Sequence, residues 1–422
     1  MKVKYSKIIE LLIWIHLIMW ILVIPVTEFQ MIYFGKKIIT TFTLGIVEVI
    51  VLCIYITLKM SSTSNMIFNA TSKLAMSLVV VFMICWFIGL IANPDTALYY
   101  KFYYIFYWIM PFIIVVISYQ ETIDIDKILK FILITSIVNG VMIICQRFSN
   151  SLIWPFKEDD LGNTLFYISE TYYNTTKMVR SPGICMSGLD SGSLLVFGIV
   201  ITFGANYLKS IYKFLLSCFF IVCIWFTGTR NVYLLLLFII GMYIVNIIFK
   251  DNKKTRRRIS IVLTGMAVLV ALLLQLNLNM SNSATRNILT DYSSIGIRMS
   301  VWMDILSYIS SGSFLQVLTG HSVWQTAGYP TIIDNMYLEL LIMNGLLGVI
   351  AFCVYLIKLA KIAVNLEKSE LIPYYSFVLG MFIYGMLNVI GCQNLSIIML
   401  CAIMFSQISK GECKNENKYN TE

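Results

Sequence analysis

Apolar runs alternate with polar segments along the whole chain, and two of the polar segments are far longer than the others. A span needs about 20 apolar residues to cross a hydrocarbon core of about 30 Å, and most of the runs are near that length. The two hydrophilic breaks extend from Gln146 to Gly183 and from Asn277 to Ile333. This pattern predicts twelve membrane spans, at Ile8–Val26, Ile38–Leu58, Leu74–Ala92, Phe102–Ser118, Ile128–Cys145, Ser187–Ala205, Phe214–Phe226, Val232–Phe249, Ile259–Leu276, Met336–Leu356, Ile372–Ile390 and Leu395–Ile408.

Composition places the chain in the same class. Of the 422 residues, 59% are hydrophobic and 13% are charged, and the mean hydropathy of +0.82 exceeds that of soluble globular proteins. No segment has the composition of a separate soluble domain, so we expect one all-α polytopic membrane domain over residues 1–422. The basic start Met1-Lys2-Val3-Lys4 precedes an apolar run without a small-residue cleavage site. This indicates a retained first helix rather than a signal peptide.

The distribution of lysine and arginine predicts the orientation. A dense basic cluster separates the eighth and ninth predicted spans, and such clusters resist translocation and stay in the cytoplasm. With this segment inside, both termini are cytoplasmic, and residues 146–183 and 277–333 form two long outer loops. The net charge of +9 therefore reflects membrane orientation and does not indicate a nucleic-acid partner. The cluster consists of Lys250, Lys253, Lys254, Arg256, Arg257 and Arg258.

The second outer loop contains a helical pattern. Between Thr285 and Leu318, apolar residues recur at four-residue spacing. This predicts an amphipathic helix that lies along the outer membrane surface. Arg298 comes four residues before Trp302, so both side chains share one face of this helix. The apolar positions are Ile297, Val301, Ile305 and Ile309.

Aromatic residues crowd the start of the fourth predicted span. At the end of a span such residues usually form a belt at the membrane interface. They equally suit stacking on sugar rings, and the sequence leaves both interpretations open. The residues are Tyr99, Tyr100, Phe102, Tyr103, Tyr104, Phe106, Tyr107 and Trp108.

Candidate metal ligands are few. The ten cysteines lie mostly within spans and include no Cys-x-x-Cys pair, and the only histidines are His16 and His321. We predict no metal site or disulfide, and we interpret Glu158-Asp159-Asp160 as a solvated acidic turn rather than a cation site. For Glu48, in the middle of a span, we expect a polar contact between helices. Inside the spans, the costly carboxyl groups are those of Glu48, Asp190 and Glu339.

Four motifs follow one another between residues 180 and 348. They are Arg180-Ser181-Pro182-Gly183, then Thr227-Gly228-Thr229-Arg230, then Gly296-Ile297-Arg298 with Trp302, and last the stretch from Gly320 through Asp334-Asn335-Met336-Tyr337-Leu338-Glu339 to Gly345 and Gly348. In this order they resemble the Arg-x-x-Gly, T-x-[ST]-R, second-arginine and G-x-G…[HD]-N-x-Y-L…G-x-x-G motifs of the Wzy polymerase and O-antigen ligase superfamily. The matches cover most of Arg180–Gly348, and the first half matches only as a pattern of spans.

One departure from the family pattern bears on the activity. Ligases of the superfamily have His-Asn where this chain has Asp334-Asn335, and the second glycine of G-x-G is replaced in Gly320-His321-Ser322. The Asp form looks more like a repeat-unit polymerase than a ligase. A neighbouring imidazole is available from His321.

The resemblance implies a metal-independent membrane glycosyltransferase without a cofactor, on the outer face of the bacterial plasma membrane. Such a polymerase transfers the growing glycan from undecaprenyl diphosphate to a hydroxyl of the next lipid-linked repeat unit. Its partners are the donor and acceptor oligosaccharides, membrane lipids, a flippase and a chain-length regulator, and no nucleic acid. Asp334 is the expected general base. The expected substrate-binding residues are Arg230, Arg298, Arg180, Asn335, Glu339 and His321.

Structural alternatives accompany each of these roles. Arg230 also suits a snorkelling anchor at a span end, and Arg298 a solvated position on a surface helix. Asp334 also suits the N-cap of the tenth span, alone or together with a catalytic role. Three other functional classes remain: a ligase of the same superfamily, a flippase for lipid-linked oligosaccharides, and a GT-C glycosyltransferase with Glu28 as its acidic residue.

Overall fold

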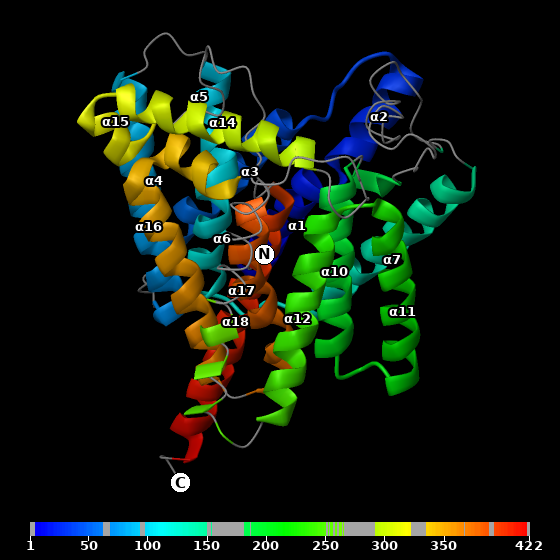
Figure 1. Cartoon of the computed structure of the whole chain (residues 1–422). Helices are drawn as coiled ribbons and strands as arrows, with labels where there is room; N and C mark the ends of the chain where they lie inside the picture. Colours follow the sequence, from blue (N-terminus) through cyan, green and yellow to red (C-terminus); the bar gives the residue numbers. More distant parts are fainter. Residues whose placement is uncertain are drawn as a thin grey trace.

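The computed structural model consists of helices, with no strand among the residues that it describes (Figure 1). These residues are 5–61, 68–92, 98–149, 153, 181–185, 187–249, 252, 254–255, 258–259, 261–263, 265, 292–321, 335–366, 368–387 and 392–419. The predicted all-α class is therefore confirmed for this part of the chain.

Up to residue 149, the described residues form seven α-helices, of which α5 is the shortest, and two π-helical turns. The elements are α1 (Tyr5–Leu17), π-helical η1 (Ile18–Leu22), α2 (Val23–Phe34), α3 (Thr41–Met60), α4 (Ala70–Ala92), α5 (Leu98–Tyr104), π-helical η2 (Ile105–Ile109), α6 (Met110–Ser118) and α7 (Ile125–Ser149).

The second half begins with a short 3₁₀ turn and continues as helices. The elements are η3 (Gly183–Cys185), α10 (Gly188–Gly204), α11 (Ser210–Thr227), α12 (Arg230–Ile248), α14 (Tyr292–Ser311), α15 (Phe314–Thr319), α16 (Met336–Asn365), η4 (Ser369–Leu371), α17 (Ile372–Leu387) and α18 (Cys392–Tyr419).

Eight helical stretches of the described residues are long and apolar enough to cross a membrane. Their outward sides are apolar as well: on α11, Phe214, Leu215 and Trp225 are 54–65% exposed. Contiguous apolar surface of this kind is rare on a soluble monomer and fits contact with lipid. The chain is therefore a helical protein of membrane-embedded character. The count of twelve spans stays a prediction, and most of the ninth, Ile259–Leu276, lies outside the described residues.

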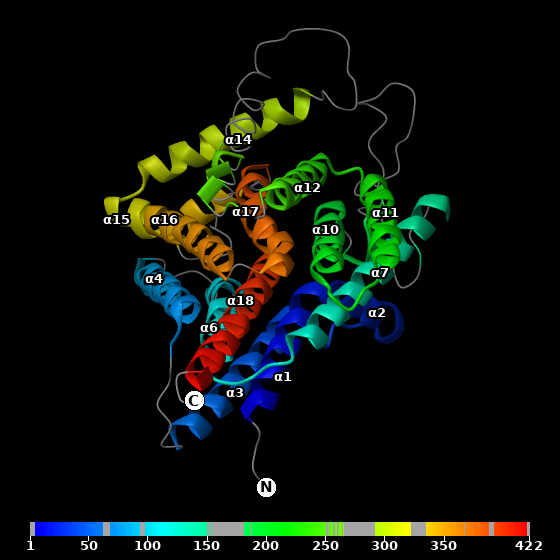
Figure 2. The ribbon, with the colours of Figure 1, turned by 90° about the horizontal axis from the view of Figure 1, so that it is seen from below.

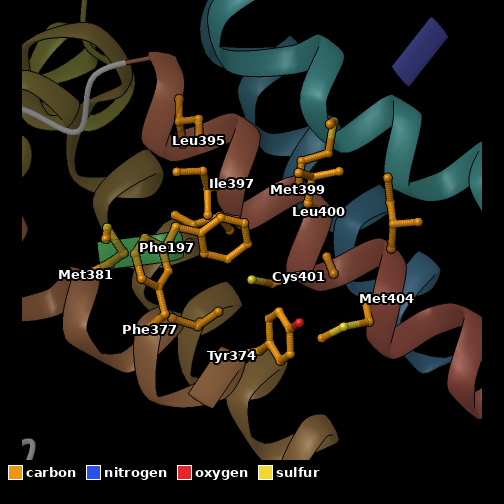
Figure 3. Close-up of a cluster of buried hydrophobic side chains, with 14 of the residues drawn as sticks. Phe197, Tyr374, Phe377, Met381, Leu395, Ile397, Met399, Leu400, Cys401 and Met404 are labelled. Atoms are coloured by element: carbon orange, nitrogen blue, oxygen red, sulfur yellow. The ribbon is translucent and has the colours of Figure 1, made fainter. Parts of the chain in front are cut away.

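The C-terminal helix α18 forms the centre of the bundle, as the view along the helices shows (Figure 2). Every residue from 395 to 405 is at most 4% exposed, as expected for a helix that is apolar all round. Figure 3 shows α18 side chains packed against Phe197 of α10 and Tyr374, Phe377 and Met381 of α17. The rings of Phe197 and Phe377 lie 5.2 Å apart.

One end of the bundle carries the elements that the motifs occupy. The turn between α11 and α12 lies at this end, and α14 runs crosswise to the upright helices there, while α18 extends to the opposite end (Figure 1). The predicted amphipathic helix of Thr285–Leu318 is divided in two. The helix ends at Ser311, and Ser313 starts α15 with a capping box that it shares with Gln316. Both α15 and α14 pack on α16.

Two glycines allow α15 and α16 to meet backbone to backbone. Gly320, with φ of +73°, follows α15, and Gly345, with φ of +61°, breaks the helical path of α16. A Cβ atom on Gly345 would lie 2.3 Å from the carbonyl carbon of Leu318. The backbone N–H of His321 donates to the carbonyl of Ile342 at 2.7 Å. The Gly320–Gly345 stretch of the sequence motif is thus a close helix crossing with a kink.

Replacing Gly345 with alanine should therefore destabilise the protein strongly. The left-handed conformation alone costs about 1–3 kcal/mol for other residues, and the clash with Leu318 adds to this cost. Gly241 is the matched control, because it lies inside α12 with nothing within 4 Å of an added Cβ. Alanine there should be neutral or stabilising by up to about 1 kcal/mol. Thermal unfolding of the two detergent-solubilised variants tests this. Equal melting temperatures would contradict the close crossing.

Candidate functional site

The turn between α11 and α12 is built by its own four residues. Helix α11 ends at Thr227, and Gly228 adopts the left-handed conformation, with φ of +62°. This is the usual role of glycine after a helix C-terminus. Thr229 then reverses the chain, and Arg230 is the first residue of α12. The motif Thr227-Gly228-Thr229-Arg230 is therefore a tight turn that presents an arginine at the start of a helix.

The start of α12 lacks a side-chain cap. The Thr229 hydroxyl donates to the carbonyl of Thr227 at 3.2 Å and accepts no hydrogen bond from the first turn of α12. The N–H groups at the start of a helix carry partial positive charge and favour an anion in front of them. A 19-residue helix that begins with arginine and that the Thr229 side chain does not cap is therefore suited to bind phosphate groups.

A buried irregular segment attaches the first arginine motif to this turn. The backbone N–H of Ser181 donates to the carbonyl of Phe226 at 3.1 Å. Gln146 of α7 holds the next residues in place: its side chain accepts from the N–H of Gly183 at 2.8 Å and donates to the carbonyl of Gly183 at 3.4 Å. Asn139 accepts from the N–H of Ile184 at 2.9 Å. The segment that follows Arg180 and the turn that precedes Arg230 are thus one structural unit.

The three predicted arginines differ in how much of each the structure describes. Arg180 lies outside the described residues. For Arg230 and Arg298 the helix is described, but their side chains are not. The structure brings the Ser181–Gly183 segment and the α11–α12 turn together, and it places α14 at the same end of the bundle (Figure 1). Convergence of the arginine side chains stays a prediction.

Helix α14 docks on the protein through the apolar face that the sequence predicts. Ile305 is fully buried and Ile309 is nearly so, and both pack with Leu338 and Ile342 of α16. Trp302 contacts the same cluster from the half-buried side. The helix that carries Arg298 is therefore fixed against the start of α16 rather than held by lipid alone.

The start of α16 is capped by Asn335. Its side-chain oxygen accepts from the N–H groups of Tyr337 at 2.9 Å and Leu338 at 3.2 Å, and its amide donates to the carbonyl of Met386 at 3.1 Å. The alternative role of Asp334 as this N-cap is therefore wrong. Asp334 itself lies outside the described residues. Asn335, predicted to bind substrate, is buried and its side chain is engaged in holding α16 against α17.

His321 is buried between α15 and the start of α16. Its ring packs against the ring of Tyr308 of α14, with centroids 5.3 Å apart. Burial lowers the pKa of His321 from its ordinary value of 6.5, because the charged form loses its hydration. The imidazole is therefore neutral at neutral pH. It is not a source of positive charge for a diphosphate.

Glu339 lies one turn into α16 and is 4% exposed. The Tyr107 hydroxyl donates to its Oε1 at 3.5 Å, and its Oε2 is buried with no hydrogen-bond partner among the described residues. Tyr104, Tyr107 and Trp108 are themselves at most 1% exposed. For these three aromatic residues the interfacial-belt interpretation is wrong, because they lie inside the bundle and their polar atoms point to α16.

The sequence did not indicate several residues that shape this end of the bundle. Gln146 and Asn139 organise the Ser181–Gly183 segment, and the Arg147 guanidinium lies 5.7 Å from the centre of the Phe226 ring beside the turn. Asn139 and Gln146 could have been noticed in the sequence as amide side chains within an apolar run. Glu48 has a partner that the sequence did not indicate: the Nδ1 atom of fully buried His16 lies 2.8 Å from its Oε1.

The chain matches no protein-family model, and no curated protein is significantly similar to it. The order of the motifs and the geometry at one end of the bundle are therefore the basis on which a function is assigned.

Proposed function

We propose that the chain is a Wzy-type polysaccharide polymerase that extends a surface glycan on undecaprenyl diphosphate. One observation carries the proposal: α12 begins with Arg230, and the turn before it is joined by the hydrogen bond between Ser181 and Phe226 to the segment that follows Arg180. Helix α14, with Arg298, lies at the same end of the bundle. In this proposal, Arg180, Arg230 and Arg298 gather at that end of the bundle, where their charges would suit a lipid-linked diphosphate.

Arginine fits this substrate for physical reasons. Its planar guanidinium donates paired hydrogen bonds to phosphate oxygens and stays charged. The N–H groups at the start of α12 add fixed partial positive charge. Both act on the charge that develops on the diphosphate as it leaves, which is the main demand of the reaction. The sugar–diphosphate bond supplies the energy, so no nucleotide is required at the outer surface.

The transfer is a substitution at the anomeric carbon of the donor sugar. A hydroxyl oxygen of the acceptor repeat unit bonds to this carbon, and the bond from the carbon to the diphosphate oxygen breaks. The electron pair leaves with undecaprenyl diphosphate, held by Arg230 and Arg298. The hydroxyl proton passes to the carboxylate of Asp334 as general base. Since Asn335 caps α16, Asp334 is not needed for that purpose.

The proposal includes the setting of the site. The twelve spans lie in the bacterial plasma membrane with both termini in the cytoplasm, and the end that carries α14 and the α11–α12 turn faces outside. The donor and acceptor are lipid-linked oligosaccharides, delivered by a flippase and limited in length by a regulator. No metal or cofactor takes part.

A flippase for lipid-linked oligosaccharides is the second candidate, and one observation favours it. His16 and Glu48 form a fully buried pair between α1 and α3. The second polar atom of each side chain, Nε2 of His16 and Oε2 of Glu48, has no partner among the described residues. Ionisable pairs within membrane helices often serve proton-driven transport. The arginine motifs, which lie in the other half of the chain, have no obvious use in such a cycle.

Deletion of the gene distinguishes these functions. For a polymerase we expect an intact envelope that carries single repeat units in place of long surface polysaccharide, sized by gel electrophoresis. Complementation with the intact gene should restore the ladder. Accumulation of lipid-linked units inside the cell would contradict the polymerase and support the flippase. Long free polymer that is no longer attached to its final acceptor would support a ligase.

A further inference from the structure

The first part of α16 is a short helical arm, residues 335–344, between the cap at Asn335 and the kink at Gly345. It is held from several sides. Asn335 donates to the carbonyl of Met386 in α17, and the carbonyl of Ile342 accepts from His321. In the proposed function the general base is Asp334, the residue that directly precedes this arm in the sequence.

The Tyr337 hydroxyl of the arm also donates to the carbonyl of Phe382 in α17 at 3.0 Å. Further polar contacts of the arm come from the first half of the chain. Three aromatic residues of the α5–η2 segment each direct one polar atom at the arm. The pairs are Tyr104 hydroxyl with Asn344 Oδ1, Tyr107 hydroxyl with Glu339 Oε1, and Trp108 Nε1 with Met343 Sδ, the last at 3.1 Å.

Tyr107 is held by two ring contacts. Its ring centroid lies 4.8 Å from that of Trp108 and 5.9 Å from that of Trp20 of η1, both in edge-to-face geometry. It lies in the π-helical turn η2, and such turns are often found at functional sites. These ring contacts hold the side chain of Tyr107 and thereby define where its hydroxyl lies relative to Glu339.

A carboxyl group at position 339 is costly unless it has a task. Glu339 is buried, and none of the ion pairs among the described residues involves it. An apolar side chain would suit the surrounding Leu340 and Met343 better. The carboxyl group adds a hydrogen bond between the arm and Tyr107 through Oε1. Its second oxygen, Oε2, has no hydrogen-bond partner among the described residues.

We propose that Tyr107 and Glu339 are positioning residues for the transfer: their contact holds the α16 arm so that Asp334 meets the acceptor hydroxyl. The effect on the transfer rests on the proposed function, whereas the contact between Tyr107 and Glu339 does not depend on it. It gives the first half of the chain a part in the reaction, because Tyr107 and Trp108 of η2 contact the arm that follows Asp334 in the sequence.

The geometric part is tested by hydrogen exchange on the purified protein in lipid nanodiscs. Tyr107→Phe and Glu339→Gln should each raise exchange of the amides of residues 339–344 about threefold or more, with little change at the start of α12. Tyr355→Phe is the matched control, because Tyr355 is fully buried in the same helix and its hydroxyl bonds to no residue that the structure describes. It should leave exchange unchanged. Unchanged exchange in both test variants would overturn the proposal.

The functional part is tested with the same variants and lipid-linked repeat units. Loss of one hydrogen bond should lower kcat about 3- to 10-fold at unchanged KM for the donor, because the arginines still bind the diphosphate. The double variant should be no slower than the slower single variant, since both remove one contact. Loosened exchange with full kcat would overturn the positioning role. An inactive wild-type protein would instead refute the polymerase and leave the exchange result standing.

Discussion

Replacing Arg230 or Arg298 with alanine is expected to abolish chain extension without preventing membrane insertion. Arg230 begins α12 at the end of the bundle where α14 carries Arg298 (Figure 1). Loss of one preorganised group that stabilises developing charge typically costs a factor of about 10² to 10³ in rate. Lysine should rescue poorly, because an ammonium group cannot form the paired hydrogen bonds of guanidinium with phosphate oxygens.

The measurement is the length distribution of polymer made by each variant in a deletion strain, with the membrane level of the protein determined in parallel. Arg258→Ala serves as the control, because Arg258 belongs to the basic cluster that is predicted to face the cytoplasm. It should support normal polymer. If one of the two test variants also makes near-normal polymer, that arginine does not belong to the diphosphate site.

Helix positions were largely predictable because they follow from apolar length. The predicted span Ile38–Leu58 corresponds to α3, which starts at Thr41 because Thr40 caps it together with Thr43. The division between α14 and α15 was missed, although Ser313 and Gln316 form a capping box that the sequence contains. A four-residue apolar repeat continues through such a break and therefore conceals it.

The contacts within the site were less predictable because they depend on partners from distant helices. Aromatic residues at a span end predict an interfacial belt only if they face lipid, and for Tyr104 and Tyr107 the partners on α16 are more than 200 positions away. The π-helical turns η1 and η2 have no signature in the sequence. Glu48 was correctly expected to make a polar contact between helices, and only the fold identifies His16 as the partner.

A difference of one residue decided how the start of α16 was interpreted. Asp and Asn are both good N-caps, but only Asp334 was proposed for this role from the sequence. The structure assigns the cap to Asn335 through its bonds to Tyr337 and Leu338. This removes a structural reason for an acid at position 334 and makes the two neighbouring residues separable by experiment.

Asp334→Asn is accordingly expected to be stably expressed yet to make little or no polymer. A neutral amide cannot take the proton of the acceptor hydroxyl, and loss of a general base typically costs a factor of about 10² to 10⁴ in rate. Asp334→Glu should be partly active. Asn335→Ala should show the opposite profile: loss of the cap costs about 1 kcal/mol, and the Met386 carbonyl also loses its donor, while some polymer is still made. Melting temperature and polymer length, measured for all three variants, separate the two roles. Full-length polymer from Asp334→Asn would show that position 334 is not the general base.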